Sequence, residues 1–334
     1  MNALDGYRSP TYDDAVDGDG RLRPEGRAVL EAVLAHDLTA LAQAVHDDID
    51  GRGIKFAAVN GDDSWHVDPI PRVIGRADWE RLEAGLAQRA RALNAFVADV
   101  YGRRRIVAEG VVPQRVLDTA EHLEPALAGV VPPDGVWVGI AGLDVVRDSD
   151  GGWLVLEDNV RTPSGIAYWH AAREALLERL ALEPEDCPRP LDGVITAALR
   201  DAFGPGRIVV LTDGPDNSAY WEHCWIAERL EIPLVQAADL TVRDDRLWYD
   251  GGAVDGVYRR TDADTLDSEA GELLQPVLVA GGVKLVNCFG TGVADDKLAH
   301  AYVPDMIRFY LGEEPALDQV ETFDLGQELS LIHI

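Results

Sequence analysis

The sequence predicts a mixed α/β fold, in which an α+β unit built on a hairpin is followed by a parallel α/β domain. Two observations support this prediction. Apolar runs flank a turn at Asp150-Gly151, which is typical of a buried hairpin, and from Arg207 onward short apolar strands alternate with amphipathic helices. At 334 residues the chain is long enough to form two or more domains.

The N-terminal third is predicted to be mainly helical. Residues 1–22 are polar and rich in Asp and Gly, a composition that favours a flexible acidic arm. Residues 23–128 then show helical periodicity with turn signals between the periodic stretches. The elements expected there are a helix over residues 24–46, a hairpin over 56–61 and 65–68, and a long helix over 79–101 capped by Asp78.

A hairpin centred on Asp150-Gly151 is the most informative local feature, because this pair is strongly favoured at the two central positions of a type I′ turn. Strand residues whose numbers sum to 301 would then face one another, and Asp144 would lie opposite Glu157. A turn centred on Gly151-Gly152 is the alternative. It would place Asp144 opposite Asp158 instead.

Asp144, Glu157 and Asn159 are the candidate metal ligands. Two carboxylates that face each other on paired strands repel, so the arrangement requires a bound cation or a shared proton. Asn159 lies two residues beyond Glu157 and therefore points to the same face. Oxygen ligands of this kind suit Mg²⁺. A solvated strand end is the alternative, since Asp and Asn also begin turns, but the apolar sequence on both faces of the hairpin favours a buried sheet.

Arg161, Ser164 and Gly165 follow the hairpin and lead into an amphipathic helix over residues 167–180. Ser164 is a candidate N-cap, and the free amides of the first turn would attract an anion beside the metal ligands. Arg161 is the candidate catalytic residue, because its guanidinium could bind a phosphate oxygen or stabilise developing negative charge. A structural salt bridge to a nearby Asp is the alternative for Arg161.

The second half of the chain has the alternation of a parallel α/β domain. One strand ends in Arg259 and Arg260, at the edge where ligands collect in open α/β sheets, and both guanidinium groups suit a substrate carboxylate or phosphate. Surface charge after an edge strand is the alternative. Lys297 could reach an anion from the start of a helix, or could simply be solvated. The expected elements are strands over 208–212, 234–236, 254–258 and 283–287, a small hairpin over 242–249, and helices over 219–230 and 296–311.

Composition excludes several classes of partner. The net charge of −29 opposes binding to nucleic acid and to anionic lipid. We expect neither a membrane span nor a signal peptide, because the sequence has no apolar run of the required length and no basic region before an apolar one. The three cysteines, Cys187, Cys224 and Cys288, are isolated from one another, which fits a reducing, cytoplasmic compartment.

Several motifs along the chain share one family resemblance. They are Asp68-Pro-Ile-Pro-Arg-Val-Ile74, the helix 85–96, Asp144-Val-Val-Arg-Asp148, Trp153-Leu-Val-Leu-Glu-Asp-Asn-Val-Arg-Thr-Pro-Ser-Gly165, Asn217-Ser-Ala-Tyr-Trp-Glu-His223, Tyr258-Arg-Arg-Thr-Asp262 and Gly290-Thr-Gly-Val-Ala-Asp-Asp-Lys297. In this order they resemble the circularly permuted ATP-grasp family, type 2, whose members are often labelled glutathionylspermidine synthase-like. The resemblance covers about residues 20–322.

The resemblance implies an ATP-dependent carboxylate–amine or carboxylate–thiol ligase. In such an enzyme Mg²⁺-ATP phosphorylates a small-molecule carboxylate, and an amine or thiol attacks the acyl phosphate. The family pattern places the metal on Asp144, Glu157 and Asn159. It also implies a circularly permuted ATP-grasp core over residues 129–205 and a Rossmann-like pre-ATP-grasp α/β domain over residues 206–322.

The family continues into a segment with a Lys-Pro pair and a glycine-rich loop that covers the ATP phosphates. Residues 323–334 no longer resemble the family, and we expect an unstructured or truncated tail there. A missing C-terminal segment or a protein partner would then complete the nucleotide site. Two other functions remain open at this stage. One is a non-catalytic scaffold that needs such a partner, and the other is a hydrolase that uses Asp144 and Glu157 as acid and base.

Overall fold

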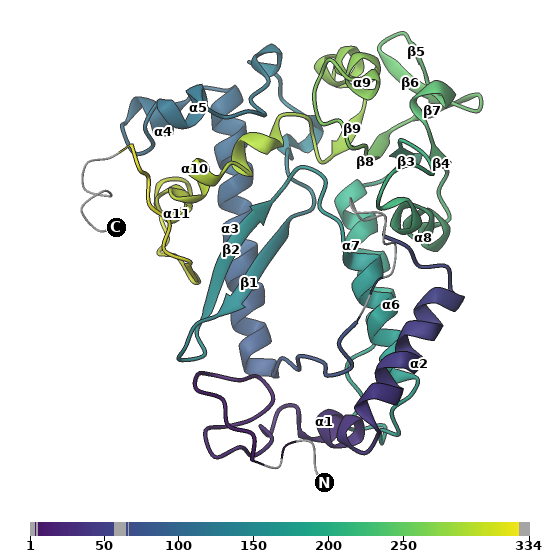
Figure 1. Cartoon of the computed structure of the whole chain (residues 1–334). Helices are drawn as coiled ribbons and strands as arrows, with labels where there is room; N and C mark the ends of the chain where they lie inside the picture. Colours follow the sequence, from purple (N-terminus) through teal and green to yellow (C-terminus); the bar gives the residue numbers. More distant parts are fainter. Residues whose placement is uncertain (1–3, 5, 57–64, 66, 327–334) are drawn as a thin grey trace.

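The computed structural model describes residue 4, residues 6–56, residue 65 and residues 67–326. Within these residues the strands form three separate sheets, with the strand orders β1-β2-β10, β4-β3-β8-β9 and β5-β6-β7. Helices lie against these sheets and connect them (Figure 1). The predicted mixed α/β class is therefore confirmed.

Three helices dominate the N-terminal third: α1 (Arg27–Leu34), α2 (Leu38–Gly51) and α3 (Arg76–Tyr101). The single helix predicted over residues 24–46 is wrong, because Asp37 starts a second helix by accepting a hydrogen bond from the amide of Ala40 (2.9 Å). The hairpin predicted over 56–68 falls largely on residues outside the described part of the chain.

The break between α1 and α2 bends the chain by 98°. Taken together, this bent pair has the length and composition of a membrane span, whereas no single described helix has. The apolar faces of both helices lie in one buried cluster with α6 (Ile166–Leu177), which includes Val33, Val45, Ile49 and Tyr168.

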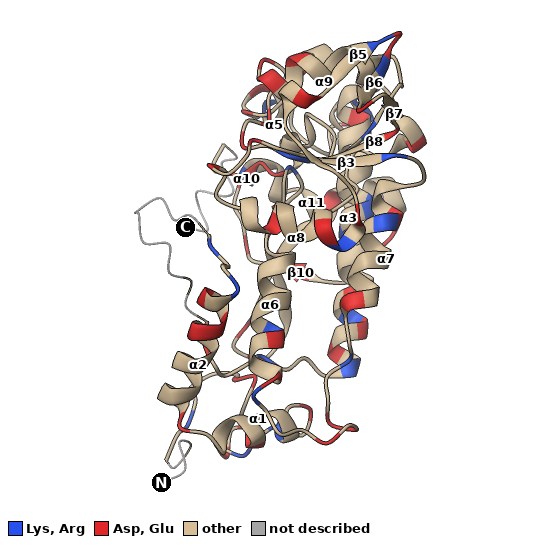
Figure 2. Ribbon diagram, turned by 90° about the vertical axis from the view of Figure 1, so that its right-hand side faces the viewer, with Lys and Arg blue, Asp and Glu red and all other residues tan. Residues whose placement is uncertain are grey.

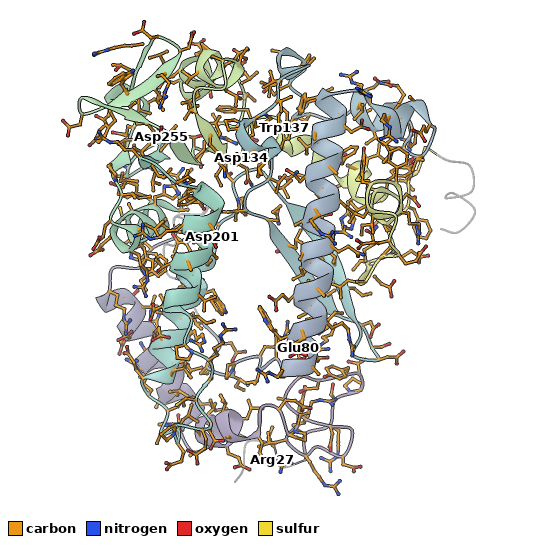
Figure 3. All side chains as sticks on the ribbon, turned by 180° about the vertical axis from the view of Figure 1, so that it is seen from behind. Arg27, Glu80, Asp134, Trp137, Asp201 and Asp255 are labelled. Atoms are coloured by element: carbon orange, nitrogen blue, oxygen red, sulfur yellow. The ribbon has the colours of Figure 1, made fainter. Side chains whose placement is uncertain are left out.

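Helix α3 begins three residues earlier than predicted. Its N-cap is Gly75, so the prediction that Asp78 caps the helix is wrong. Asp78 lies in the first turn instead, where its carboxylate accepts a hydrogen bond from the guanidinium of Arg147 (2.7 Å). Figure 3 labels Glu80 near the start of α3 and Trp137 beside its far end, and Trp137 stacks there on Tyr101 with ring centroids 4.8 Å apart.

Residues 6–22 contact the tip of the predicted hairpin, and the prediction of a flexible arm did not include this contact. The amide of Tyr12 donates to the carbonyl of Ser149 (3.1 Å), and Asp14 pairs with Arg147 (3.1 Å). The Arg147 guanidinium also lies over the Tyr12 ring, 5.0 Å from its centroid. These contacts join the N-terminal segment to the tip of the hairpin, which is the end distant from Asp144 and Glu157.

The predicted hairpin consists of β1 (Gly142–Arg147) and β2 (Trp153–Asn159), and Asp144 lies opposite Glu157 as predicted. The turn, however, is not type I′. Gly151 has φ +89°, but Asp150 is not among the residues with positive φ. The Asp148 carboxylate instead accepts hydrogen bonds from the amides of Asp150 (2.9 Å) and Gly152 (2.7 Å).

A β-bulge at Leu156 restores the predicted facing. Near the tip the numbers of facing residues sum to 300, as for Arg147 and Trp153, and beyond the bulge they sum to 301. The bulge also reverses which residues of β2 point inward. Trp153 and Val155 are buried before it, and Asp158 and Val160 are buried after it. Glu157 and Asn159 are therefore left on the same outer face as Asp144.

The hairpin is fixed on one side by helix α3 and by the short strand β10 (Asp318–Gln319), which pairs in parallel with β2. A small buried cluster of Leu82, Trp153, Val155 and Leu317 fills the space between them. Figure 1 shows α3 running alongside β1 and β2. The outer face of the hairpin is thereby held in place from behind.

The approach to β1 is fixed by two asparagines rather than by strand pairing. The side-chain oxygen of Asn94 accepts hydrogen bonds from the amides of Trp137 (2.9 Å) and Val138 (3.0 Å). The side-chain oxygen of Asn287 does the same for Gly139 (2.7 Å) and Ile140 (2.9 Å). Residues 136–141, which belong to the apolar run before the turn, therefore form an ordered connection outside the sheet.

The second half contains the predicted parallel sheet, with β4 (Leu234–Val235), β3 (Ile208–Thr212), β8 (Gly256–Arg260) and β9 (Lys284–Val286) in this spatial order. Helices α7 (Asp192–Phe203) and α8 (Tyr220–Leu230) pack on one face, and α9 (Glu269–Val279) packs on the other. The chain passes from β3 out to β4 and returns to the far side of β3, so a topological switch point lies between β3 and β8.

The remaining elements are short. The helix predicted over residues 296–311 is divided into α10 and α11, with Pro304 in the first turn of the second helix, where a missing amide is tolerated. Their bounds are α10 (Lys297–His300) and α11 (Val303–Leu311); the others are α4 (Arg105–Ala108), α5 (Arg115–Asp118), η1 (Pro125–Leu127), η2 (Pro133–Gly135), η3 (Ala237–Asp239), η4 (Thr291–Ala294), β5 (Thr241–Arg243), β6 (Arg246–Tyr249) and β7 (Gly252–Val254).

The largest buried cluster crosses the predicted domain boundaries. It contains Phe96 from α3, Trp137 from the approach to β1 and Leu285 from the parallel sheet. The division at residues 128 and 205 stays a prediction. Acidic residues are spread over the face shown in Figure 2, for example on α2 and α9, in keeping with 59 Asp and Glu against 30 Lys and Arg.

Candidate functional site

A polar pocket of about 190 Å³ lies where the hairpin ends and the loop to α6 begins. Its position follows from the bulge, which directs Asn159 outward, and from the loop after Val160, which turns back over the end of β1. The pocket is lined by Gly142, Asp144, Asn159, Arg161, Thr162, Pro163, Ser164 and Asp295.

The three candidate metal ligands lie together on this side of the hairpin. Asp144 is exposed, Glu157 is half-buried, and each faces the other across the ladder. The ammonium of Lys297, from the first turn of α10, forms an ion pair with Glu157. No group of three or more His, Cys, Asp or Glu suited to a metal occurs in the described part of the chain, so any cation here would depend on the amide of Asn159 and on non-protein oxygens as well.

Arg161 is held at the pocket by two side chains that the sequence analysis did not include. Its Nε donates to Asp295 (2.8 Å), and its Nη1 lies 2.9 Å from Nε2 of His122. Asp295 also accepts a hydrogen bond from the amide of Val160 (2.5 Å). Burial raises the pKa of Asp295, while the guanidinium of Arg161 and the Val160 amide oppose that rise. The salt bridge considered as the alternative for Arg161 is therefore present, yet Arg161 still lines the pocket.

The start of α6 is occupied by a carboxylate of the protein itself. Glu222, from α8, accepts hydrogen bonds from the amides of Gly165 (2.9 Å) and Ala167 (3.0 Å). The prediction that Ser164 caps this helix is wrong, because Gly165 holds the N-cap position and Ser164 accepts a hydrogen bond from Arg260. The amides predicted to attract an external anion thus bind an internal one.

The two arginines at the end of β8 are buried rather than exposed. Arg260 pairs with Glu222 (3.1 Å) and also donates to the carbonyl of Pro163. Arg259 pairs with Asp264 (2.5 Å) and lies over the ring of Phe289. Since β8 is a central strand, the alternative of surface charge after an edge strand is wrong for both. Arg259 is fully buried, so we correct its predicted contact with substrate to a structural contact.

A second pocket, of about 270 Å³, lies at the carboxyl ends of β3 and β8, next to the switch point. Asp213, which directly follows β3, borders this pocket, and its carboxylate accepts a hydrogen bond from the amide of Asp262 (2.6 Å). The backbone passes directly from Arg260, which donates to the carbonyl of Pro163 in the lining of the first pocket, to Thr261, which lines the second. The two pockets are therefore joined by consecutive residues of one strand end.

Sequence reasoning missed the residues that hold the site in place. These are Asp158, Asp295, Glu222 and His122. A signal existed for three of them, since Asp158, Glu222 and Asp295 fall inside the motifs that carried the family resemblance. Their partners come from distant segments, and spacing alone gives no means of pairing them.

The buried imidazole of His223 predicts a loss of stability in mild acid. Burial, together with the nearby charge of Arg260, lowers the pKa of His223 from its ordinary value of 6.5 to about 3. The unfolded chain therefore binds a proton below pH 6.5 that the folded chain does not bind, and the free energy of unfolding falls with pH from 6.5 toward 3.

Between pH 7.5 and 5.5 this effect amounts to about 1.4 kcal/mol. We expect His223→Gln to lose that much less stability than the wild type over this interval, as measured by urea unfolding at both pH values. An equal loss in the two proteins would contradict the assignment.

The comparison with family models places the chain among the ATP-grasp proteins. Residues 71–334 match the model described as circularly permuted ATP-grasp type 2, and the chain belongs to this family. The resemblance predicted from the motifs is confirmed.

Two curated relatives show the extent of the similarity. A putative glutamate–cysteine ligase of Frankia casuarinae is 39% identical over 99% of this chain and 41% of the relative. An uncharacterised protein of Synechocystis is 40% identical over 81% of this chain and 61% of the relative. The chain thus spans less than two thirds of the length of either relative. For this reason the first relative's name assigns no substrate to the shared part.

One solved structure is also similar, a glutathione synthetase-like effector from Globodera pallida in its apo form. It has a TM-score of 0.48 and 14% identity, and the match covers 83% of this chain and 69% of the effector.

Proposed function

We propose that the protein is an ATP-dependent ligase that joins a small-molecule carboxylate to an amine or thiol through an acyl phosphate. The observation that carries this proposal is the facing of Asp144 and Glu157 across the hairpin, with Asp144, Asn159 and Arg161 lining one polar pocket. Membership of the ATP-grasp family supports the same reaction class.

The donor atoms of the site fit Mg²⁺. Two carboxylates and one amide oxygen are hard ligands, and Mg²⁺ in phosphate-transferring sites is commonly held by one or two carboxylates plus substrate phosphates. Asp144, Glu157 and Asn159 would hold the ion, which would neutralise phosphate charge during transfer. Lys297 pairs with Glu157 and would move toward the phosphates, or toward solvent, when a divalent cation takes its place.

Arg161 would stabilise the charge of the transferring phosphoryl group. The protein contributes mainly position and charge to such a reaction, and a guanidinium can contact two phosphate oxygens at once. Asp295 and His122 set its direction before substrate arrives. The second pocket, at the carboxyl ends of β3 and β8, is the proposed place for the carboxylate or its nucleophile.

The first pocket is too small for a whole nucleotide, because sites for ligands of drug size usually enclose about 300–1,000 Å³. We propose that a further segment of the kind found in the longer relatives, or a protein partner, covers the rest of ATP. The strongly negative net charge supports small-molecule partners rather than nucleic acid or membranes, and we propose a cytoplasmic protein.

Isothermal titration calorimetry with Mg²⁺-ATP tests the proposal. The chain would be compared with a version extended by the Lys-Pro and glycine-rich segment of the family. We expect weak binding by the chain alone and clear binding by the extended version. Absence of binding in both would favour a non-catalytic scaffold. A scaffold would also be compatible with the first amides of α6 being bound by Glu222 instead of by a phosphate.

Arg161→Ala is expected to lower kcat of the extended protein about 10²- to 10³-fold, the usual effect of removing one donor to a transition-state charge. Arg161→Lys should recover part of the rate, because it keeps the charge but not the fork of donors. Phosphate release measured at saturating Mg²⁺-ATP gives both values. Wild-type kcat in Arg161→Ala would remove this residue from the reaction.

A further inference from the structure

The buried side chain of Asp158 lies between two proposed metal ligands in the sequence and on the opposite face of the strand. Successive side chains of a strand alternate in direction, so Glu157 and Asn159 point toward the pocket side while Asp158 points into the core. Whatever fixes the direction of Asp158 therefore also fixes the direction of its two neighbours.

Asp158 is fixed by a network of buried side chains. Both of its carboxylate oxygens accept hydrogen bonds from Arg89 of α3, from Nε (2.6 Å) and Nη2 (2.7 Å). The ring Nδ1 of His300, from α10, lies 2.7 Å from the same carboxylate. Gln319 of β10 accepts from Arg89 (3.1 Å) and donates to the His300 carbonyl (3.0 Å). The bidentate contact between Arg89 and Asp158 allows little rotation of the Asp158 side chain.

The segment 295–300 contacts the end of β2 and the two residues that follow it. Lys297 pairs with Glu157, His300 contacts Asp158, and Asp295 accepts from the Val160 amide while holding Arg161. One short segment therefore positions both the proposed metal ligands and the proposed phosphate-binding arginine.

We infer that Asp158, Arg89 and His300 form a positioning clamp, which directs Glu157 and Asn159 toward the cation. Asp158, Arg89 and His300 are not among the residues that line the pocket, and all three are almost fully buried. They act on the metal only through the strand. This inference rests on the proposed function, because it takes Glu157 and Asn159 to be metal ligands.

Binding of Mn²⁺ to the full chain, followed by electron paramagnetic resonance, tests the clamp without requiring activity. Mn²⁺ favours the same oxygen ligands as Mg²⁺. We expect Asp158→Asn to weaken Mn²⁺ binding about 10- to 100-fold, as is typical when a group that orients a metal ligand is removed. Arg89→Lys keeps the buried charge but loses the bidentate contact, and it should weaken binding in the same direction if Asp158→Asn does not fold.

Asp78→Asn is the matched control, because Asp78 also joins α3 to the hairpin, through Arg147 at the distant tip. It should leave the Kd for Mn²⁺ within about twofold. If a clamp variant only unfolded part of the protein, the number of Mn²⁺ sites per chain would fall at unchanged Kd. The clamp predicts instead that the Kd for Mn²⁺ rises while one site per chain remains.

Two outcomes would overturn the inference, and they differ in what else they overturn. Unchanged Kd in both clamp variants would remove the clamp and leave the proposed metal site intact. Absence of Mn²⁺ binding by the wild type, or binding that survives Glu157→Ala, would overturn the metal site and the clamp together.

Discussion

Glu157→Gln is expected to abolish metal-dependent ATP turnover in the protein extended by the family's nucleotide-binding segment. The substitution removes one of only two carboxylates on the proposed cation, and a neutral amide is a much weaker ligand for Mg²⁺. It also leaves the Lys297 ammonium unpaired beside the site. We expect turnover to fall to the background rate in a phosphate-release assay over a wide range of Mg²⁺ concentrations.

The stability of this variant should change little. Glu157 and Lys297 are both partly exposed, and exposed ion pairs contribute about 0–1 kcal/mol. Glu109→Gln, which removes an exposed carboxylate paired with Arg105 outside the pocket lining, is the control for loss of charge alone. Wild-type turnover in Glu157→Gln would remove Glu157 from the mechanism.

Glu222→Gln is expected to destabilise the fold by about 3–5 kcal/mol, the cost of removing one partner of a buried ion pair. The substitution leaves the Arg260 guanidinium buried without its counter-charge, and it weakens the bonds to the first amides of α6. Unfolding in urea at pH 7.5 measures the change.

Glu228→Gln on the same helix is the matched control, because Glu228 is exposed. It should change the free energy of unfolding by less than about 0.5 kcal/mol, as is usual for surface substitutions. Equal free energies of unfolding for the two variants would show that Glu222 contributes no more to stability than an exposed glutamate does.

The elements that were predicted well are those specified by local sequence. The run 208–212 consists of apolar residues followed by Thr212 and is mostly β-branched, and it forms a fully buried strand with the predicted bounds. The hairpin over 242–249 was also found, since Asp244 and Asp245 both adopt positive φ in its two-residue turn, a conformation that Asp tolerates.

The elements that were missed depend on tertiary contacts. Arg89 and Asp158 are 69 residues apart, and Lys297 and Glu157 are 140 residues apart. An isolated charged residue is most often exposed, so nothing in the local pattern marked Arg89, Asp158 or Arg260 as buried. The facing of Asp144 and Glu157 was predicted correctly from a turn that does not exist, because the bulge at Leu156 compensates for the different turn.

That bulge has a consequence for how the hairpin can change during evolution. The alternation of side chains along β2 shifts by one residue at Leu156, between the tip and the end that carries the candidate ligands. The candidate ligands therefore take their orientation from this one unpaired residue and from the network behind it. Insertions or deletions in the tip, residues 148–152, could then be absorbed without turning Glu157 inward. If β2 instead continued past Leu156 without the bulge, Asp144 would face Leu156, Glu157 and Asn159 would turn inward, and Asp158 would be exposed in their place. Deletion of Leu156 would remove only the extra residue and would leave Glu157 opposite Asp144.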